Sequence, residues 1–192
     1  MNKSAITVAP IMPVLAERWS PRSFDANYQL TQHELLSILE AARWAPSANN
    51  GQPWRFAVVN RGEALFDQVV ADGLSGFNQA WAPRSSTLVV VSIQTKLADG
   101  RENNGALYDA GLSVANLVIQ AQELGLHAHQ MSGIVPAGLS NAFGLHEDIR
   151  PIVVVAIGKV APADQLEGPA YEREIQPRTR LELDEIVLHG KP

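Results

Sequence analysis

Apolar residues recur at helical spacing in several segments of this chain, and capping or turn residues bound those segments. The run Thr31-Gln32-His33-Glu34 has the form of a capping box, in which both outer side chains can pair with backbone N–H groups. The apolar positions after it predict a helix to about Trp44, because Pro46 cannot continue it. The same spacing predicts further helices over residues 63–71, 105–125 and 136–143.

The segment 105–125 carries the strongest helical pattern. Residues spaced by about 3.5 positions are expected to share one face of this helix, namely Leu107, Gly111, Val114, Val118 and Ala121. Several residues inside the helix are small, which lets another backbone or a flat ligand come close. They are Ala106, Ala110, Gly111 and Ala115.

Three runs rich in β-branched or aromatic residues predict buried strands, over residues 54–59, 87–93 and 152–158. The segment 161–178 is rich in proline and polar residues, and we expect it to lack regular structure. The short apolar tail 181–188 could pack as an arm on a partner chain. Helices and buried strands alternate, so we expect one domain over residues 1–192, of the α+β or α/β class, with helices covering a central sheet.

Composition narrows the possible functions. Charged residues make up 18% of the chain, below the usual roughly 25%, which hints at surface hidden in an oligomer. The net charge of −5 argues against a nucleic-acid binder. The chain has no cysteine, so disulfides, thiolate nucleophiles and iron–sulfur clusters are excluded. No apolar run approaches the length of a membrane span, and we expect a cytoplasmic protein without a membrane partner.

Familiar catalytic and nucleotide-binding motifs are missing from the sequence. It contains no G-x-G-x-x-G run after a strand, no P-loop and no G-x-S-x-G elbow. His127 and His129 could face one way on a strand, but no third ligand lies nearby, so we expect no metal site. The four tryptophans are individually more typical of a core or an interface than of a cofactor box.

Arginines and hydroxyls are the remaining means of holding an anion. Arg18 and Ser20 precede the first capped helix, and Arg178 and Arg180 lie near the C-terminus. A guanidinium binds a phosphate through paired, charge-assisted hydrogen bonds. The alternative is that these arginines are solvated surface residues, and sequence spacing does not decide between the two.

Longer motifs around these residues resemble the nitroreductase-like family of FMN-dependent oxidoreductases, from about residue 15 to 187. The most specific match is the run Pro-Ser-x-x-Asn-x-Gln-Pro-Trp at residues 46–54. The other matches are Arg18-x-Ser20-x-Arg22-x-Phe24, Phe77-Asn78, Asp109-x-Gly111, Asn116-Leu117, Gly125-Leu126, Ser132-Gly133 and Arg178-x-Arg180. The resemblance implies an α+β, three-layer fold with a central, mostly antiparallel sheet, in a homodimer that exchanges its C-terminal arms and binds FMN at the interface.

The resemblance also implies roles for particular residues. Arg18, Arg178 and Arg180 would bind the FMN phosphate, with Ser20 beside it. Arg22 and Asn78 would bond to the pyrimidine edge of the flavin, and a backbone N–H near Ser132-Gly133 would point at its reactive nitrogen. The loop with Pro46, Ser47, Ala48 and Asn50 would come from the second subunit. The complete expected set is Arg18, Trp19, Ser20, Arg22, Pro46, Ser47, Ala48, Asn50, Asn78, Ser132, Gly133, Arg178 and Arg180.

The expected reaction needs no catalytic side chain, since the flavin performs the chemistry and the protein positions and polarises it. NADH or NADPH would reduce the flavin, and a nitroaromatic, a quinone or another planar acceptor would follow on the same face in ping-pong order. Arg22 would stabilise the charge that develops on hydride transfer.

Two departures from the family leave the substrate class open. Trp81 stands where many relatives carry a second basic residue, so the flavin edge should be less positive and an aromatic wall could shape the pocket. Ser132 stands where relatives often carry an acid. The alternatives are another enzyme on this scaffold (a dehalogenase, an azoline oxidase or a flavin-consuming enzyme) and a flavin-binding protein without turnover.

Overall fold

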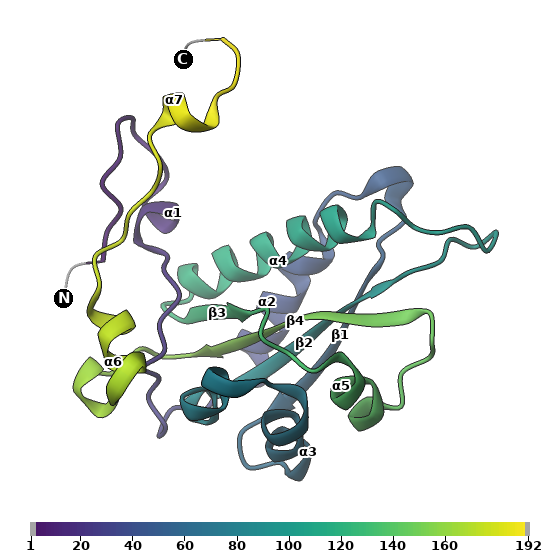
Figure 1. The fold of residues 1–192 in the computed structure, drawn as a ribbon, viewed down its shortest axis with the longest axis horizontal. Helices are drawn as coiled ribbons and strands as arrows, with labels where there is room; N and C mark the ends of the chain where they lie inside the picture. Colours follow the sequence, from purple (N-terminus) through teal and green to yellow (C-terminus); the bar gives the residue numbers. More distant parts are fainter. Residues whose placement is uncertain (1–2, 191–192) are drawn as a thin grey trace.

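A four-stranded antiparallel sheet forms the centre of the protein in a computed structural model, which describes residues 3–190 (Figure 1). Its strands are β1 (Trp54–Asn60), β2 (Thr87–Gln94), β3 (His127–Met131) and β4 (Ile149–Gly158). They lie in the order β1-β2-β4-β3, and every neighbouring pair is antiparallel. The fold is therefore α+β, and the three strands expected from the sequence are confirmed.

The described residues contain seven α-helices. They are α1 (Pro13–Glu17), α2 (Gln32–Arg43), α3 (Ala64–Gln68), α4 (Ala106–Glu123), α5 (Pro136–Phe143), α6 (Gly168–Ile175) and α7 (Leu183–Ile186). Helices α2 and α4 cover one face of the sheet, and α3 and α5 cover the other (Figure 1). The buried strand β2 serves both faces, since Val89 and Val91 pack with α2 and α4, whereas Leu88 and Val90 pack with α3 and α5.

Local signals set the ends of two helices as the sequence predicts. At α2, the Thr31 hydroxyl accepts the Glu34 N–H at 3.2 Å, and the Glu34 carboxylate accepts the Thr31 N–H at 2.8 Å. This reciprocal pairing is a complete capping box. Helix α5 ends at Gly144, whose φ of 57° is left-handed and suits a residue without a Cβ.

The register gives the sheet two distinct ends. Asn60 pairs with Thr87, and Thr87 with Ile157, at what we call the Thr87 end. Trp54 pairs with Ile93 at the other end, which we call the Trp54 end. Strand β1 has seven residues, so the two ends lie roughly 20 Å apart.

The expected face of the long helix is wrong in part. Leu107 is 55% exposed and Gly111 is also exposed, whereas the face against the sheet and α2 is formed by Ala106, Asp109, Ala110, Ser113, Val114, Leu117, Val118 and Ala121. Close approach of another backbone does occur, since the Ser113 hydroxyl donates to the Ala42 carbonyl of α2 at 2.8 Å. The helix carries apolar residues on two sides, and periodicity does not show which side packs on the sheet.

The segment 161–178 is also not irregular as expected, because it contains α6. Gly168 is the first residue of the helix and has a φ of 53°, Pro169 follows it in the first turn, and Ala170 and Glu174 are buried. The tail beyond it forms the single turn α7, with Leu181, Leu183, Ile186 and Leu188 all exposed. This tail runs beside the N-terminal segment at one side of the molecule (Figure 1). Its packing on a partner remains a prediction.

Candidate functional site

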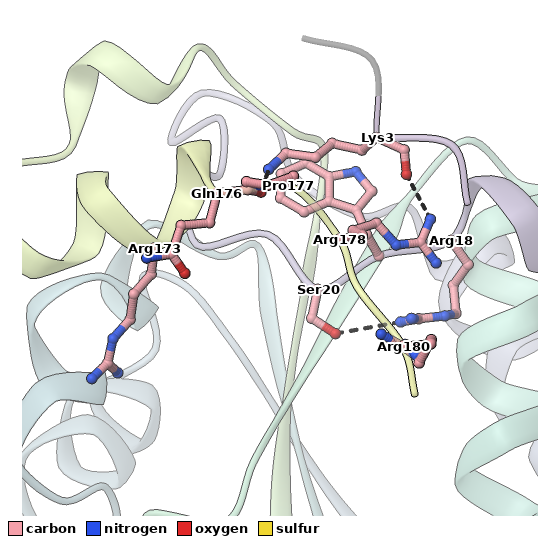
Figure 2. A pocket seen from close by; sticks show the side chains of 9 residues that line it. Lys3, Arg18, Ser20, Arg173, Gln176, Pro177, Arg178 and Arg180 are labelled. Carbon is pink, nitrogen blue, oxygen red and sulfur yellow. Dashed lines mark hydrogen bonds between the residues drawn. The ribbon is translucent and has the colours of Figure 1, made fainter. Parts of the chain in front are cut away.

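Four residues expected to hold a phosphate lie around one cavity, although they come from opposite ends of the chain. The cavity has a volume of about 250 Å³. It is lined by Lys3, Arg18, Trp19, Ser20, Arg173, Gln176, Pro177, Arg178 and Arg180. Figure 2 shows the side chains of Arg18 and Arg180 close to Ser20. We call Arg18, Arg178 and Arg180 the arginine cluster.

Backbone and side-chain bonds hold this cluster in place. Arg18 follows α1, its backbone N–H donates to Val14, and its guanidinium donates to the Ser20 hydroxyl at 3.3 Å. The Arg178 guanidinium donates to the carbonyls of Lys3 and Ala16, each at 2.6 Å. These bonds join the C-terminal segment to the N-terminal segment and so create the cavity between them.

The arginine cluster lacks a carboxylate partner, since no ion pair among residues 3–190 involves any of its members. Burial, and then the charges of Arg178 and Arg180, lower the pKa of Arg18. Burial and the charge of Arg180 likewise lower the pKa of Arg178. Like charges held together in a protein with a net charge of −5 are typical of a site for an anion.

A second part of the site surrounds Phe77. The guanidinium of Arg22 lies 5.7 Å from the centre of this ring, and its Nε is buried without a hydrogen-bond partner. The next residue, Asn78, donates from its side-chain amide to the Gly133 carbonyl at 3.1 Å. That bond leaves the amide oxygen of Asn78 as an acceptor.

Close packing explains the glycine in the Ser132-Gly133 pair. A Cβ at Gly133 would lie 2.8 Å from the Asn78 side-chain nitrogen and 3.1 Å from the Ser75 hydroxyl. The Gly133 carbonyl also accepts the Ser75 N–H at 3.0 Å. Gly133 thus fixes the position of Asn78, while Ser132 is exposed.

Helix α6 supplies two site residues that the sequence analysis missed. Glu174 is only 3% exposed, and its carboxylate accepts the backbone N–H groups of Arg22 at 2.7 Å and of Ser23 at 3.1 Å. Its neighbour Arg173 lies 4.6 Å from the centre of the Phe77 ring. No motif marks either residue, because both lie in a segment whose composition indicates a loop.

Lys3 is a third residue that the sequence did not single out. Its ammonium group donates to the carbonyl of Glu174 at 2.6 Å and to that of Gln176 at 2.5 Å. It also lies 5.0 Å from the centre of the Trp19 ring. The described N-terminal segment therefore binds the end of α6 and forms one wall of the cavity.

The expected loop with Pro46, Ser47, Ala48 and Asn50 does not join this site within one chain. It precedes β1 at the Trp54 end of the sheet, whereas Phe24 and α6 lie at the Thr87 end (Figure 1). The loop is held in a defined shape. The Ala48 N–H donates to the buried Asp109 carboxylate at 3.1 Å, and Asn50 has a left-handed φ of 54°.

Of the two alternatives for Trp81, a pocket wall and a core residue, the structure shows the core residue. Its side chain is 0% exposed, and it packs between Phe24, with ring centres 6.2 Å apart, and His129, at 4.5 Å. The chain turns inward between two short 3₁₀ segments, Gly76–Ala80 and Ala82–Arg84, and buries this ring in the core.

The two histidines of β3 face the segment that carries Arg18 and Arg22. His127 packs edge-on against Trp19, and the ring nitrogen Nδ1 of His129 lies 2.8 Å from the Pro21 carbonyl. Burial lowers the pKa of each histidine to about 4, so both are neutral at pH 7 and Nδ1 of His129 is the donor. Residues 3–190 contain no group of three or more metal-ligating side chains.

No helix in the described part of the chain is long and apolar enough to cross a membrane.

Comparisons with known proteins agree on one family. The model of the nitroreductase family matches residues 15–75 and 67–159. An oxygen-insensitive NAD(P)H nitroreductase of Enterobacter cloacae is 28% identical over 92% of this chain and 98% of its own. A putative NAD(P)H nitroreductase of Bacillus subtilis, YdgI, is 26% identical over 78% of this chain and 88% of its own.

Solved structures give the same result. A crystal structure described as an oxidoreductase containing FMN has a TM-score of 0.90 and 32% identity, and the match covers 97% of this chain and 95% of that one. A putative nitroreductase in complex with FMN from Desulfovibrio desulfuricans shares the fold with a TM-score of 0.77 at 23% identity, over 96% of this chain and 99% of that one. With a family model that covers most of its length and a site built around clustered arginines, this chain belongs to the nitroreductase family of oxidoreductases.

Proposed function

We propose that this protein is an FMN-dependent oxidoreductase that uses NADH or NADPH to reduce nitroaromatic, quinone or similar planar acceptors. The observation that carries the proposal is the convergence of Arg18, Ser20, Arg178 and Arg180 on one cavity. Relatives named as NAD(P)H nitroreductases and a similar structure that contains FMN support it.

The residues present fit FMN. A flavin phosphate carries nearly two negative charges, and the arginine cluster has no carboxylate partner in the described residues. At the other part of the site, the buried Nε of Arg22 is a donor without an acceptor. The sequence lacks a dinucleotide-binding fingerprint, which favours FMN over FAD.

Bound FMN would supply the capacity to accept and pass on a hydride. The protein's part is to bind and orient it. The arginine cluster and Ser20 would hold the phosphate, and the amide oxygen of Asn78 would accept from a ring N–H. Arg22 would place positive charge where negative charge develops. The reductant NADH or NADPH and the electron acceptor would bind one after the other at the same surface, which predicts ping-pong kinetics.

We further propose a homodimer in which the loop with Pro46, Ser47, Ala48 and Asn50 completes the site of the partner subunit. Two features support it. The loop is well formed but lies at the opposite end of the sheet from the arginine cluster. The side of α4 with Leu107 and Tyr108 is exposed, as is the apolar tail with α7. Light scattering should give about twice the 20.8 kDa chain mass, and a monomer that binds FMN tightly would contradict the shared site.

The test of the function begins with the purified protein. Its visible spectrum should show a flavin, and the cofactor released by heat should migrate as FMN in chromatography. Anaerobic addition of NADH or NADPH should bleach this spectrum, and initial rates with nitroaromatic and quinone acceptors should give parallel double-reciprocal plots. Absence of flavin after reconstitution would refute the proposal. Bleaching without turnover on any acceptor would favour a flavin-binding protein, and turnover confined to halogenated or azoline substrates would favour the other enzyme classes.

A further inference from the structure

Arg173 shares an aromatic ring with Arg22. The guanidinium carbon of Arg173 lies 4.6 Å from the centre of the Phe77 ring, and that of Arg22 lies 5.7 Å from it. Both distances are within the range of a cation–π contact. Burial is the main cause that lowers the pKa of Arg22, and the charge of Arg173 adds to it. We call these two arginines the Phe77 pair.

Within residues 3–190 the Phe77 pair is neutralised only in part, because the charge of Glu174 offsets that of Arg22. No ion pair within residues 3–190 joins Arg173 to a carboxylate. The Glu174 carboxylate attracts Arg22 and offsets part of its charge, while its two oxygens accept the backbone N–H groups of Arg22 and Ser23 rather than the Arg22 guanidinium. The Nε of Arg22 is buried and has no hydrogen-bond partner among the described residues. An anionic group bound here would reduce the repulsion between the two guanidinium groups. It would also accept a hydrogen bond from the buried Nε–H of Arg22.

Helix α6 holds the pair in a fixed relation. Glu174 binds the backbone at Arg22, and the preceding residue of the same helix carries the second guanidinium. Figure 2 shows the side chain of Arg173 reaching to the side of Ser20 that is away from Arg18 and Arg180. Arg173 thus lines the same cavity as the arginine cluster, but its guanidinium extends to the other side of Ser20, towards Phe77, and Asn78 follows Phe77 directly in the chain.

We propose that Arg173 is a second cation of the FMN site and that, with Arg22, it favours the reduced form of the bound cofactor. This inference rests on the proposed function. If the arginine cluster holds the phosphate, the Phe77 pair faces the other part of the molecule, its ring system. Uptake of two electrons and one proton gives that ring one more negative charge. A nearby cation stabilises the more negative form in preference to the oxidised form.

The test measures the midpoint potential of bound FMN, together with the dissociation constant of oxidised FMN. In Arg173→Gln, the ratio of the affinity for reduced FMN to the affinity for oxidised FMN should fall about tenfold. This corresponds to a midpoint potential about 30 mV lower. Arg173→Lys keeps the charge and should keep the wild-type potential. Arg101→Gln is the control, because Arg101 is an exposed arginine paired with Asp99 in the loop between β2 and α4, at the end of the sheet opposite to α6.

The effect of losing the Arg173 charge must be distinguished from an effect on folding or on FMN binding in general. Arg173→Met keeps an apolar contact with Phe77 without the charge, so it should show the same fall in potential even if Arg173→Gln does not fold. An unchanged potential in both neutral variants would overturn the inference alone. So would an equal loss of affinity for both redox forms, because that is the effect of a structural residue. A wild-type protein that binds no FMN would overturn the proposed function as well.

Discussion

Replacing Glu174 with glutamine tests whether α6 anchors the segment that carries Arg22. The Glu174 carboxylate is 3% exposed and accepts two backbone N–H groups, at 2.7 and 3.1 Å. Glutamine keeps the shape but turns one acceptor into an NH₂ donor that faces a backbone N–H. The lost bond and the unpaired donor cost about 1.5–3 kcal/mol each. Relief from burying a charge offsets part of this, so we expect a net loss of about 2–3 kcal/mol.

The assay is thermal unfolding followed by circular dichroism. For a chain of this size, each 1 kcal/mol lowers Tm by about 2–4 °C, so Glu174→Gln should melt roughly 4–12 °C below the wild type. Glu172→Gln is the control, because Glu172 is exposed on the same helix. FMN affinity should fall only in Glu174→Gln. If the two variants melted together, Glu174 would not be the anchor of Arg22, and the reasoning would be refuted.

Three further predictions concern the same site. Arg18→Ala and Arg180→Ala should each weaken FMN binding about ten- to a hundredfold, the effect of one charge-assisted bond, in a fluorescence titration. Wild-type affinity in both would make them ordinary surface arginines. Gly133→Ala should also weaken FMN binding, because its Cβ would come within 2.8 Å of the Asn78 amide, and unchanged affinity would contradict this packing argument. Stability should fall as pH drops from 6.5 towards about 4, because His127 and His129 stay neutral in the folded chain, whereas both take up a proton in the unfolded chain. His129→Gln should remove about half of that slope in a urea-unfolding pH profile, since His127 remains, and an unchanged slope would exclude His129 as a cause.

Local patterns in the sequence determined most of the elements. The strands at β1, β2 and β4 and the helices α2, α4 and α5 were predicted within a few residues, because hydrophobic period, capping box and terminal glycine act over one or two turns. The arginine cluster and Ser20 were indicated by the motifs Arg18-x-Ser20 and Arg178-x-Arg180 and by the family resemblance that they carry. That these residues surround one cavity was decided by the fold, since Arg18 and Arg178 come from opposite ends of the chain.

Long-range contacts decided the features that the sequence did not predict. Helix α6 forms in a segment of loop-like composition, and its Glu174 is bonded to Arg22, 152 residues away in sequence. Trp81 turns into the core because Phe24 and His129 surround it, and local pattern does not show which way a ring in a short 3₁₀ segment will point. The side of α4 that meets the sheet depends on packing with α2. The sequence thus determined most of the elements and indicated the arginines expected to bind an anion, whereas tertiary packing decided how they are assembled, because burial and charge proximity are properties of the folded chain.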